Sequence, residues 1–149
     1  MASNSQGLSW SPDGSRIAFI APSRALTVVE VRTGRTDELL PKGDLEDLSG
    51  PIWSPSGDFI AVIARSAAGF YPLVLTPDGE VVGRGEPSPG GWTVVAWRVG
   101  SDDLLVARER HEETSLRSEE TSVQVQVISV AAWTPILQAE LPGQSEPSV

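Results

Sequence analysis

The chain has 149 residues, of which 40% are hydrophobic and 21% charged, a composition typical of one folded domain with a hydrophobic core. Acidic residues outnumber basic ones by 20 to 11, and the net charge of −9 disfavours anionic partners, namely nucleic acids and lipid headgroups. There is no cysteine, hence no disulfide, and no apolar run approaches the roughly 18 residues of a membrane helix. Residues 1–7 also lack the basic and apolar stretches of a signal peptide, so we expect none in this chain.

The first segment, residues 7–40, contains four short stretches with strand character, separated by turn signals. We expect strands at about residues 7–10, 16–21, 25–31 and 36–40. Trp10 ends the first stretch, and the turn sequence Pro12-Asp13-Gly14 follows it. Proline presets the backbone torsion of the second turn position, and glycine accepts the left-handed conformation that closes a hairpin. The first two strands are therefore expected to pair.

The second segment, residues 50–85, repeats this organisation. We expect strands at about residues 51–53, 58–64, 71–76 and 80–83. Trp53 ends the first of them, and Pro55-Ser56-Gly57 provides the same turn chemistry with serine in place of aspartate. A further copy of the turn, Pro77-Asp78-Gly79, lies between the third and fourth strands.

The third segment, residues 92–141, is a more divergent copy. We expect strands at about residues 93–98, 104–109, 122–130 and 134–141. Trp97 marks the first strand, but Arg98-Val99 replaces the Ser-Pro of the other segments. The charged stretch at residues 108–120 either extends the two central strands outward or forms a solvated loop. Residues 142–149 have the composition of a linker or tail.

The three segments form a repeat. Trp10, Trp53 and Trp97 are separated by 43 and 44 residues, a period typical of the blades of a β-propeller. The second strand of each segment is apolar on both faces, as expected for a blade packed between two others. We therefore predict an all-β chain of three four-stranded propeller blades, in which the three tryptophans pack between blades.

The repeat resembles a known family. Trp-Ser-Pro-Asp-Gly followed by Ile-Ala-Phe is similar to the WD-like repeat of TolB-type propellers; residues 10–19 match it best, residues 53–62 closely and residues 97–106 least. The resemblance implies closed rings of about six to eight blades. It also implies a periplasmic or extracytoplasmic location, and it extends to the propellers of prolyl-oligopeptidase-like enzymes.

Candidate catalytic and metal-binding groups are few. The single histidine, His111, has Glu112 and Ser115 nearby, but this charged stretch lacks the rigid, water-excluding frame of a nucleophilic site. No Gly-x-Ser-x-Gly sequence occurs. The acidic clusters at residues 44–47 and 102–103 lack the spacing of a calcium loop, and glycine-rich phosphate loops are absent. We expect no catalysis and no cofactor.

Protein recognition is the remaining role. Trp92 follows two glycines, so we expect it to be exposed and to contact a protein partner. The other candidate contact residues lie in the charged stretch, because loops on a rigid scaffold carry function; they are Arg108, Arg110, His111 and Arg117. The sequence favours a scaffold for protein–protein interaction or assembly. The alternative is the propeller portion of a prolyl-oligopeptidase-like hydrolase whose catalytic domain lies outside this chain.

Self-association follows from the blade count. Three blades cannot close a ring, and both end blades would expose apolar faces. Two chains would supply six blades, which is within the closed range. We therefore expect a homodimer that forms a six-bladed ring, unless the chain is a fragment whose other blades come from its parent.

Overall fold

The computed structural model of the chain describes residues 7–40, 47–87, 92–113 and 119–142. These residues contain twelve β-strands and no helix, so they include no helix that could cross a membrane. The strands are β1 (Leu8–Trp10), β2 (Arg16–Ile20), β3 (Leu26–Glu30), β4 (Thr36–Leu40), β5 (Asp47–Trp53), β6 (Ile60–Ser66), β7 (Gly69–Leu75), β8 (Val81–Arg84), β9 (Trp92–Trp97), β10 (Asp103–Glu113), β11 (Glu119–Ser129) and β12 (Thr134–Pro142).

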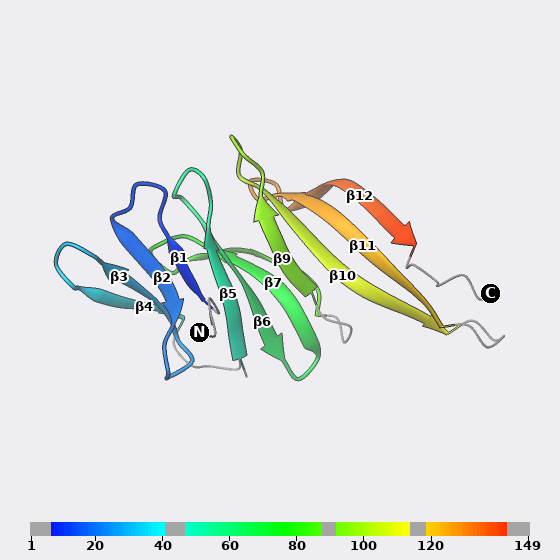
Figure 1. Cartoon of the computed structure of the whole chain (residues 1–149), viewed down its shortest axis with the longest axis horizontal. Helices are drawn as coiled ribbons and strands as arrows, with labels where there is room; N and C mark the ends of the chain where they lie inside the picture. The colour runs from blue at the N-terminus through cyan, green and yellow to red at the C-terminus, as the bar shows by residue number, and fades with distance from the viewer. Residues whose placement is uncertain (1–6, 41–46, 88–91, 114–118, 143–149) are drawn as a thin grey trace, which may run out of the picture.

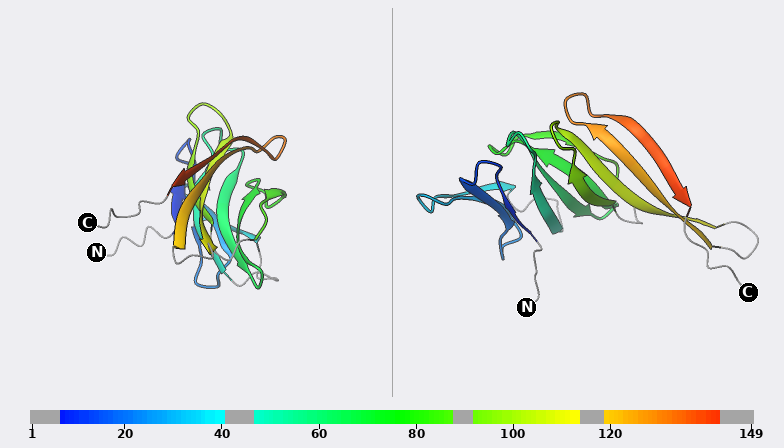
Figure 2. Two further views of the ribbon diagram at one scale, coloured as in Figure 1. Left: turned by 90° about the vertical axis from the view of Figure 1, so that its right-hand side faces the viewer. Right: turned by 45° about the horizontal axis from the view of Figure 1, so that its top comes forward.

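The strands form three antiparallel sheets, each with its four strands in chain order: β1 to β4, β5 to β8, and β9 to β12. The sheets follow one another in a row, with the second sheet in the middle (Figures 1 and 2). This is the predicted architecture: three four-stranded blades of a β-propeller that make up part of a ring. They are called blade 1, blade 2 and blade 3 below.

Tight turns join the first two strands of each blade. In blades 1 and 2 the amide of Gly14 donates to the carbonyl of Ser11 over 2.9 Å, and that of Gly57 to Ser54 over 3.0 Å. Both glycines have positive φ, +74° and +80°, as the predicted turn requires. In blade 3, where proline is missing, the positive φ moves one place earlier, to Gly100 at +82°. Blade 3 therefore makes a different turn over the same length of chain.

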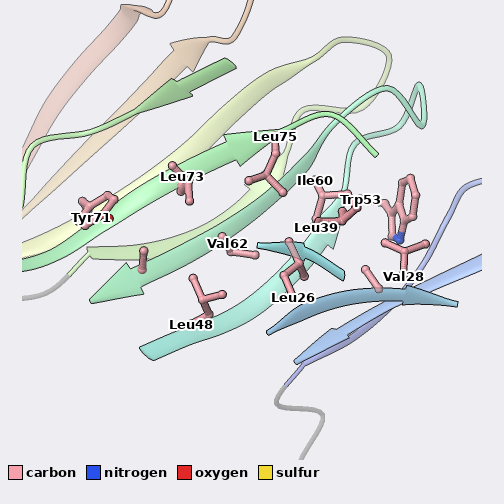
Figure 3. Close-up of a cluster of buried hydrophobic side chains, with 12 residues drawn as sticks. Leu26, Val28, Leu39, Leu48, Trp53, Ile60, Val62, Tyr71, Leu73 and Leu75 are labelled. Carbon is pink, nitrogen blue, oxygen red and sulfur yellow. The ribbon is translucent and has the colours of Figure 1, made fainter. Parts of the chain in front are cut away.

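Blade 2 is packed on both faces. Along β6, the side chains of Ile60, Val62 and Ala64 belong to a cluster shared with blade 1, whereas Ala61 and Ile63 belong to a cluster shared with blade 3. Figure 3 shows the first cluster, in which side chains of blades 1 and 2 point toward one another. The prediction that this strand is apolar on both faces because it lies between blades is confirmed.

The charged stretch of blade 3 extends its hairpin. Strand β10 continues to Glu113, and β11 begins at Glu119, opposite it in register. The first of the two predicted alternatives, strands that run further outward, therefore describes the structure. Arg117 falls outside the described residues.

Candidate functional site

Neighbouring blades are joined by a tryptophan of the later blade that packs on the earlier one. Trp53, at the end of β5, is 5% exposed, and the guanidinium carbon of Arg16 in blade 1 lies 4.9 Å from the centre of its ring. The amide of Trp53 donates to the hydroxyl of Ser9 over 3.1 Å. The indole nitrogen of Trp53 is buried and has no hydrogen-bond partner. Blade 2 is thus held on blade 1 by a cation–π contact and by a hydrogen bond from a backbone amide to a serine hydroxyl.

Blade 3 also packs on blade 2 through a tryptophan, but the contacts of this tryptophan are different. Trp97 is 8% exposed and stacks on Phe59, with ring centres 6.4 Å apart. Its indole nitrogen donates to the carbonyl of Ile52 over 3.0 Å. Phe59 follows Trp53 by six residues, as Arg16 follows Trp10. The sixth residue after each tryptophan is therefore the position that receives the tryptophan of the next blade.

Trp10 has no such neighbour among the described residues. It is 58% exposed, and Leu8 is 64% exposed, so within a single chain Trp10 does not pack between blades as predicted. The strand register places Leu8 opposite Phe19 and Trp10 opposite Ile17, on the side of blade 1 that faces away from blade 2. Val29 pairs with Ile17 and extends this surface. We call these five residues the blade 1 outer face.

Blade 3 carries a second open face. Leu105 pairs with Val127 and Ala107 with Val125, and all four side chains are partly exposed. They lie opposite the residues that pack against blade 2, such as Leu104. We call this group of four the blade 3 outer face.

An ion pair lies at the receiving position of blade 3. The sixth residue after Trp97 is Asp103, and a guanidinium nitrogen of Arg98 lies 3.5 Å from its carboxylate. The side chain of Arg98 is 68% exposed, whereas that of Asp103 is 17% exposed. Blade 3 thus holds a cation beside the position that Arg16 occupies in blade 1.

Trp92 is placed differently from the prediction. It is 8% exposed, and its indole nitrogen donates to the carbonyl of Glu86 over 3.0 Å. The guanidinium carbon of Arg108, its partner across β9 and β10, lies 4.7 Å from the ring centre. Arg108 also donates to the side chain of Gln124. Both candidate contact residues are therefore engaged within the chain itself, because strands β9 and β10 pair and bring the two side chains together.

The remaining candidate contact residues belong to the charged stretch of blade 3. Arg110 and His111 lie on β10, opposite Ser122 and Thr121. Their side chains, like Arg117 as a whole, fall outside what the structure describes. Their predicted role in protein contact stays a prediction.

Trp133 makes a contact between blades that sequence reasoning missed. It lies in the turn between β11 and β12 with a positive φ of +50°, which is uncommon for an aromatic residue. Its indole nitrogen donates to the carbonyl of Arg84 in β8 over 2.8 Å. A Cβ atom on Gly83 would lie 2.2 Å from the Trp133 ring. Gly83 itself, a glycine inside strand β8, was the available sequence signal, since a glycine within a strand often marks the close approach of another group to the backbone.

The turn residues differ in electrostatics between blades. The carboxylate of Asp13 accepts hydrogen bonds from the hydroxyl of Ser11 at 2.7 Å and from the amide and hydroxyl of Ser15 at 3.0 and 2.7 Å. These bonds, that of the Ser11 hydroxyl first, lower the pKa of Asp13 from 3.8 to about 2. In blade 2 the same position is Ser56, whose hydroxyl donates to Asp102 of blade 3 over 2.8 Å. Pro12, Asp13 and Gly14 therefore build a turn, while the serine variant also joins two blades.

A depression of about 600 Å³ at the edge of blade 1 is lined by Gly14, Ser15, Arg16, Glu30, Val31 and Arg32. Its only hydroxyl, on Ser15, already donates to Asp13, and no histidine lines it. Within the described ranges no three His, Cys, Asp or Glu side chains gather as metal ligands would.

Solved structures similar to this chain show its fold. Hydrazine synthase of Kuenenia stuttgartiensis matches 94% of the chain at 16% identity with a TM-score of 0.60. The β-propeller domain of the Trilobed protease from Pyrococcus furiosus matches 90% at 12% identity (TM-score 0.57), and a putative TolB from Agrobacterium tumefaciens matches 93% at 17% identity (TM-score 0.54).

The match covers only part of these proteins. The chain spans 38%, 41% and 50% of their respective lengths. No protein-family model matches the chain, and no curated protein matches it significantly. At such low identity the likeness concerns fold alone: this chain is a three-bladed part of a β-propeller.

Proposed function

We propose that this chain is a non-catalytic β-propeller scaffold that binds protein through the apolar outer faces of its end blades. The observation that carries the proposal is the exposure of Trp10. The equivalent residues Trp53 and Trp97 are 5% and 8% exposed because an earlier blade covers each, whereas Trp10 is 58% exposed.

The chemistry of the blade 1 outer face supports this role. Leu8 and Trp10 are largely exposed beside the half-buried Ile17 and Phe19, on paired strands. Contiguous apolar surface of this kind marks interaction sites on folded proteins, and tryptophan is enriched among residues that dominate binding energy. The net charge of −9 argues for protein rather than nucleic acid as the partner.

Site-specific photocrosslinking tests the proposal. A benzophenone amino acid is introduced at Leu8, on the blade 1 outer face, and in a matched variant at Val81, which is 46% exposed and lies on β8, an edge strand of blade 2. Irradiation in cells should give a discrete protein adduct from position 8 and none from position 81. Absence of an adduct at position 8, or equal labelling at both positions, would contradict the proposal.

A hydrolase role is the second candidate. The likeness to the propeller domain of a protease favours it, as does the resemblance of the repeat to prolyl-oligopeptidase-like propellers. In that case the nucleophile would be supplied by a domain outside this chain. A Gly-x-Ser-x-Gly motif in the flanking reading frame, together with peptidase activity of the full-length product, would favour this alternative.

A further inference from the structure

We propose that the partner of the blade 1 outer face is blade 3 of a second copy of this chain, so that the Trp10 ring lies over the Arg98–Asp103 ion pair. This inference rests on the proposed function, because it names which protein the scaffold binds. It assigns a head-to-tail contact, in which two different faces of the same chain meet.

The contacts within the chain provide the template. Blade 2 places Trp53 against Arg16 of blade 1, and blade 3 places Trp97 against Phe59 of blade 2. Each tryptophan meets the sixth residue after the tryptophan of the preceding blade. The next step in this series would bring a tryptophan to Asp103, and Trp10 is the tryptophan that remains exposed.

The surroundings of Asp103 suit an indole ring. A bare carboxylate would repel the electron-rich face of the ring, but Arg98 lies 3.5 Å from Asp103 and is 68% exposed. A guanidinium over an indole is the contact that Arg16 already makes with Trp53 at 4.9 Å. Arg98 occupies the place of Ser11 in blade 1, so the cation is particular to the end blade.

The rest of the two faces is also complementary. The blade 3 outer face offers Leu105 and Val127, and the blade 1 outer face offers Phe19 and Ile17, all partly exposed. Such apolar sheet faces are what blade 2 buries on both sides within this chain. Contact between them would remove apolar area from water without burying an unpaired charge.

Symmetry explains why a second copy satisfies both ends. A head-to-tail contact either closes a ring or continues as a filament. Two chains related by a two-fold axis make the contact twice and give a ring of six blades, within the range of about four to eight for closed propellers. Both apolar outer faces are then covered at once.

Sedimentation of paired variants tests the contact. Trp10→Ala disables only the blade 1 outer face, and Arg98→Glu only the receiving end of blade 3; Arg35→Glu is the matched control, since Arg35 is an exposed arginine in the β3–β4 turn. Wild type and Arg35→Glu should sediment as dimers at micromolar concentration. Each of the other two variants should raise the dissociation constant by about 30-fold or more, as loss of a dominant interface residue does. Circular dichroism verifies that each variant is folded.

Mixing the two variants gives the decisive result. Together they retain one intact blade 1 face and one intact blade 3 end, so an equimolar mixture should dimerise more tightly than either variant alone. A folded wild-type monomer would overturn the inference, as would a dimer that Trp10→Ala disrupts and Arg98→Glu does not. If wild type is monomeric while position 8 still crosslinks to another protein, the inference fails and the proposed function stands. If position 8 gives no adduct at all, both the inference and the proposed function fail.

Discussion

Phenylalanine substitution at two equivalent tryptophans should have unequal effects on stability. Trp53 and Trp97 are almost equally buried, so the loss of apolar area in Trp53→Phe and Trp97→Phe is nearly the same. The indole nitrogen of Trp97 donates to the carbonyl of Ile52, whereas that of Trp53 is buried without a partner. Removing the first N–H loses a hydrogen bond, and removing the second relieves an unsatisfied donor.

The magnitude follows from these differences. In Trp97→Phe, the lost hydrogen bond should lower the unfolding free energy by about 1 kcal/mol. In Trp53→Phe, removal of the unpartnered donor should raise it by about 1–2 kcal/mol. In Trp53→Phe, the weaker cation–π contact between Arg16 and the phenylalanine ring should lower the unfolding free energy by about 0.5 kcal/mol. We expect Trp97→Phe to be more destabilising than Trp53→Phe by about 2 kcal/mol.

Urea denaturation followed by far-UV circular dichroism measures the difference, provided that the two variants share one denaturant slope. Arg35→Ala is the control at an exposed turn position, and it should change stability by no more than about 0.5 kcal/mol. Equal costs at positions 53 and 97, or a larger cost at 53, would refute the reasoning.

Four further outcomes are expected. Gly83→Ala should destabilise the chain by about 1–3 kcal/mol, because its new methyl group would overlap the Trp133 ring. The loss of stability should largely vanish in a Trp133→Ala background. An equal loss of stability in that background would show that the ring is not the cause. Asp13 has a pKa in the folded chain below its ordinary value, so it stabilises the fold above about pH 4 and this contribution is lost as the pH falls toward 2. Asp13→Asn should therefore flatten the fall in the urea midpoint over that interval, and an unchanged pH profile would contradict the assignment. The purified chain should not hydrolyse generic esters or peptides, and activity that disappears in His111→Ala would overturn the non-catalytic reading. Deleting residues 112–119 should preserve cooperative unfolding, because the segment lies beyond the part of β10 that pairs with β9; a broad transition would show the hairpin end to be structural.

The tight turns and the central strand of this fold could be predicted from the sequence. Turn formation depends on a few adjacent residues, so Pro12 and Gly14 were enough to predict the first hairpin, and Gly57 the equivalent one in blade 2. Strand β6 was also predicted correctly, because a strand that is apolar on both faces is expected where a sheet is packed on both sides. Strands β2 and β10 share the apolar pattern, but each of them has one open face.

The burial of individual tryptophans could not be predicted in the same way. Trp10 and Trp53 share nearly the same local motif, yet one is exposed and the other buried, because burial depends on whether another blade lies against the ring. Trp92 was expected to be exposed beside two glycines, but strand pairing brings Arg108 onto its ring. These outcomes depend on residues distant in sequence, which a local motif does not encode.

The packing between blades also has a direction along the chain. In both interfaces the tryptophan belongs to the later blade, and the side chain that receives it, Arg16 or Phe59, belongs to the earlier one. Synthesis from the N-terminus therefore completes each receiving surface before the tryptophan that needs it leaves the ribosome. Trp53 and Trp97 can be buried as soon as they emerge, which shortens the time that large aromatic side chains are open to aggregation. Trp10 differs from both, because no earlier blade among the described residues offers it a receiving surface.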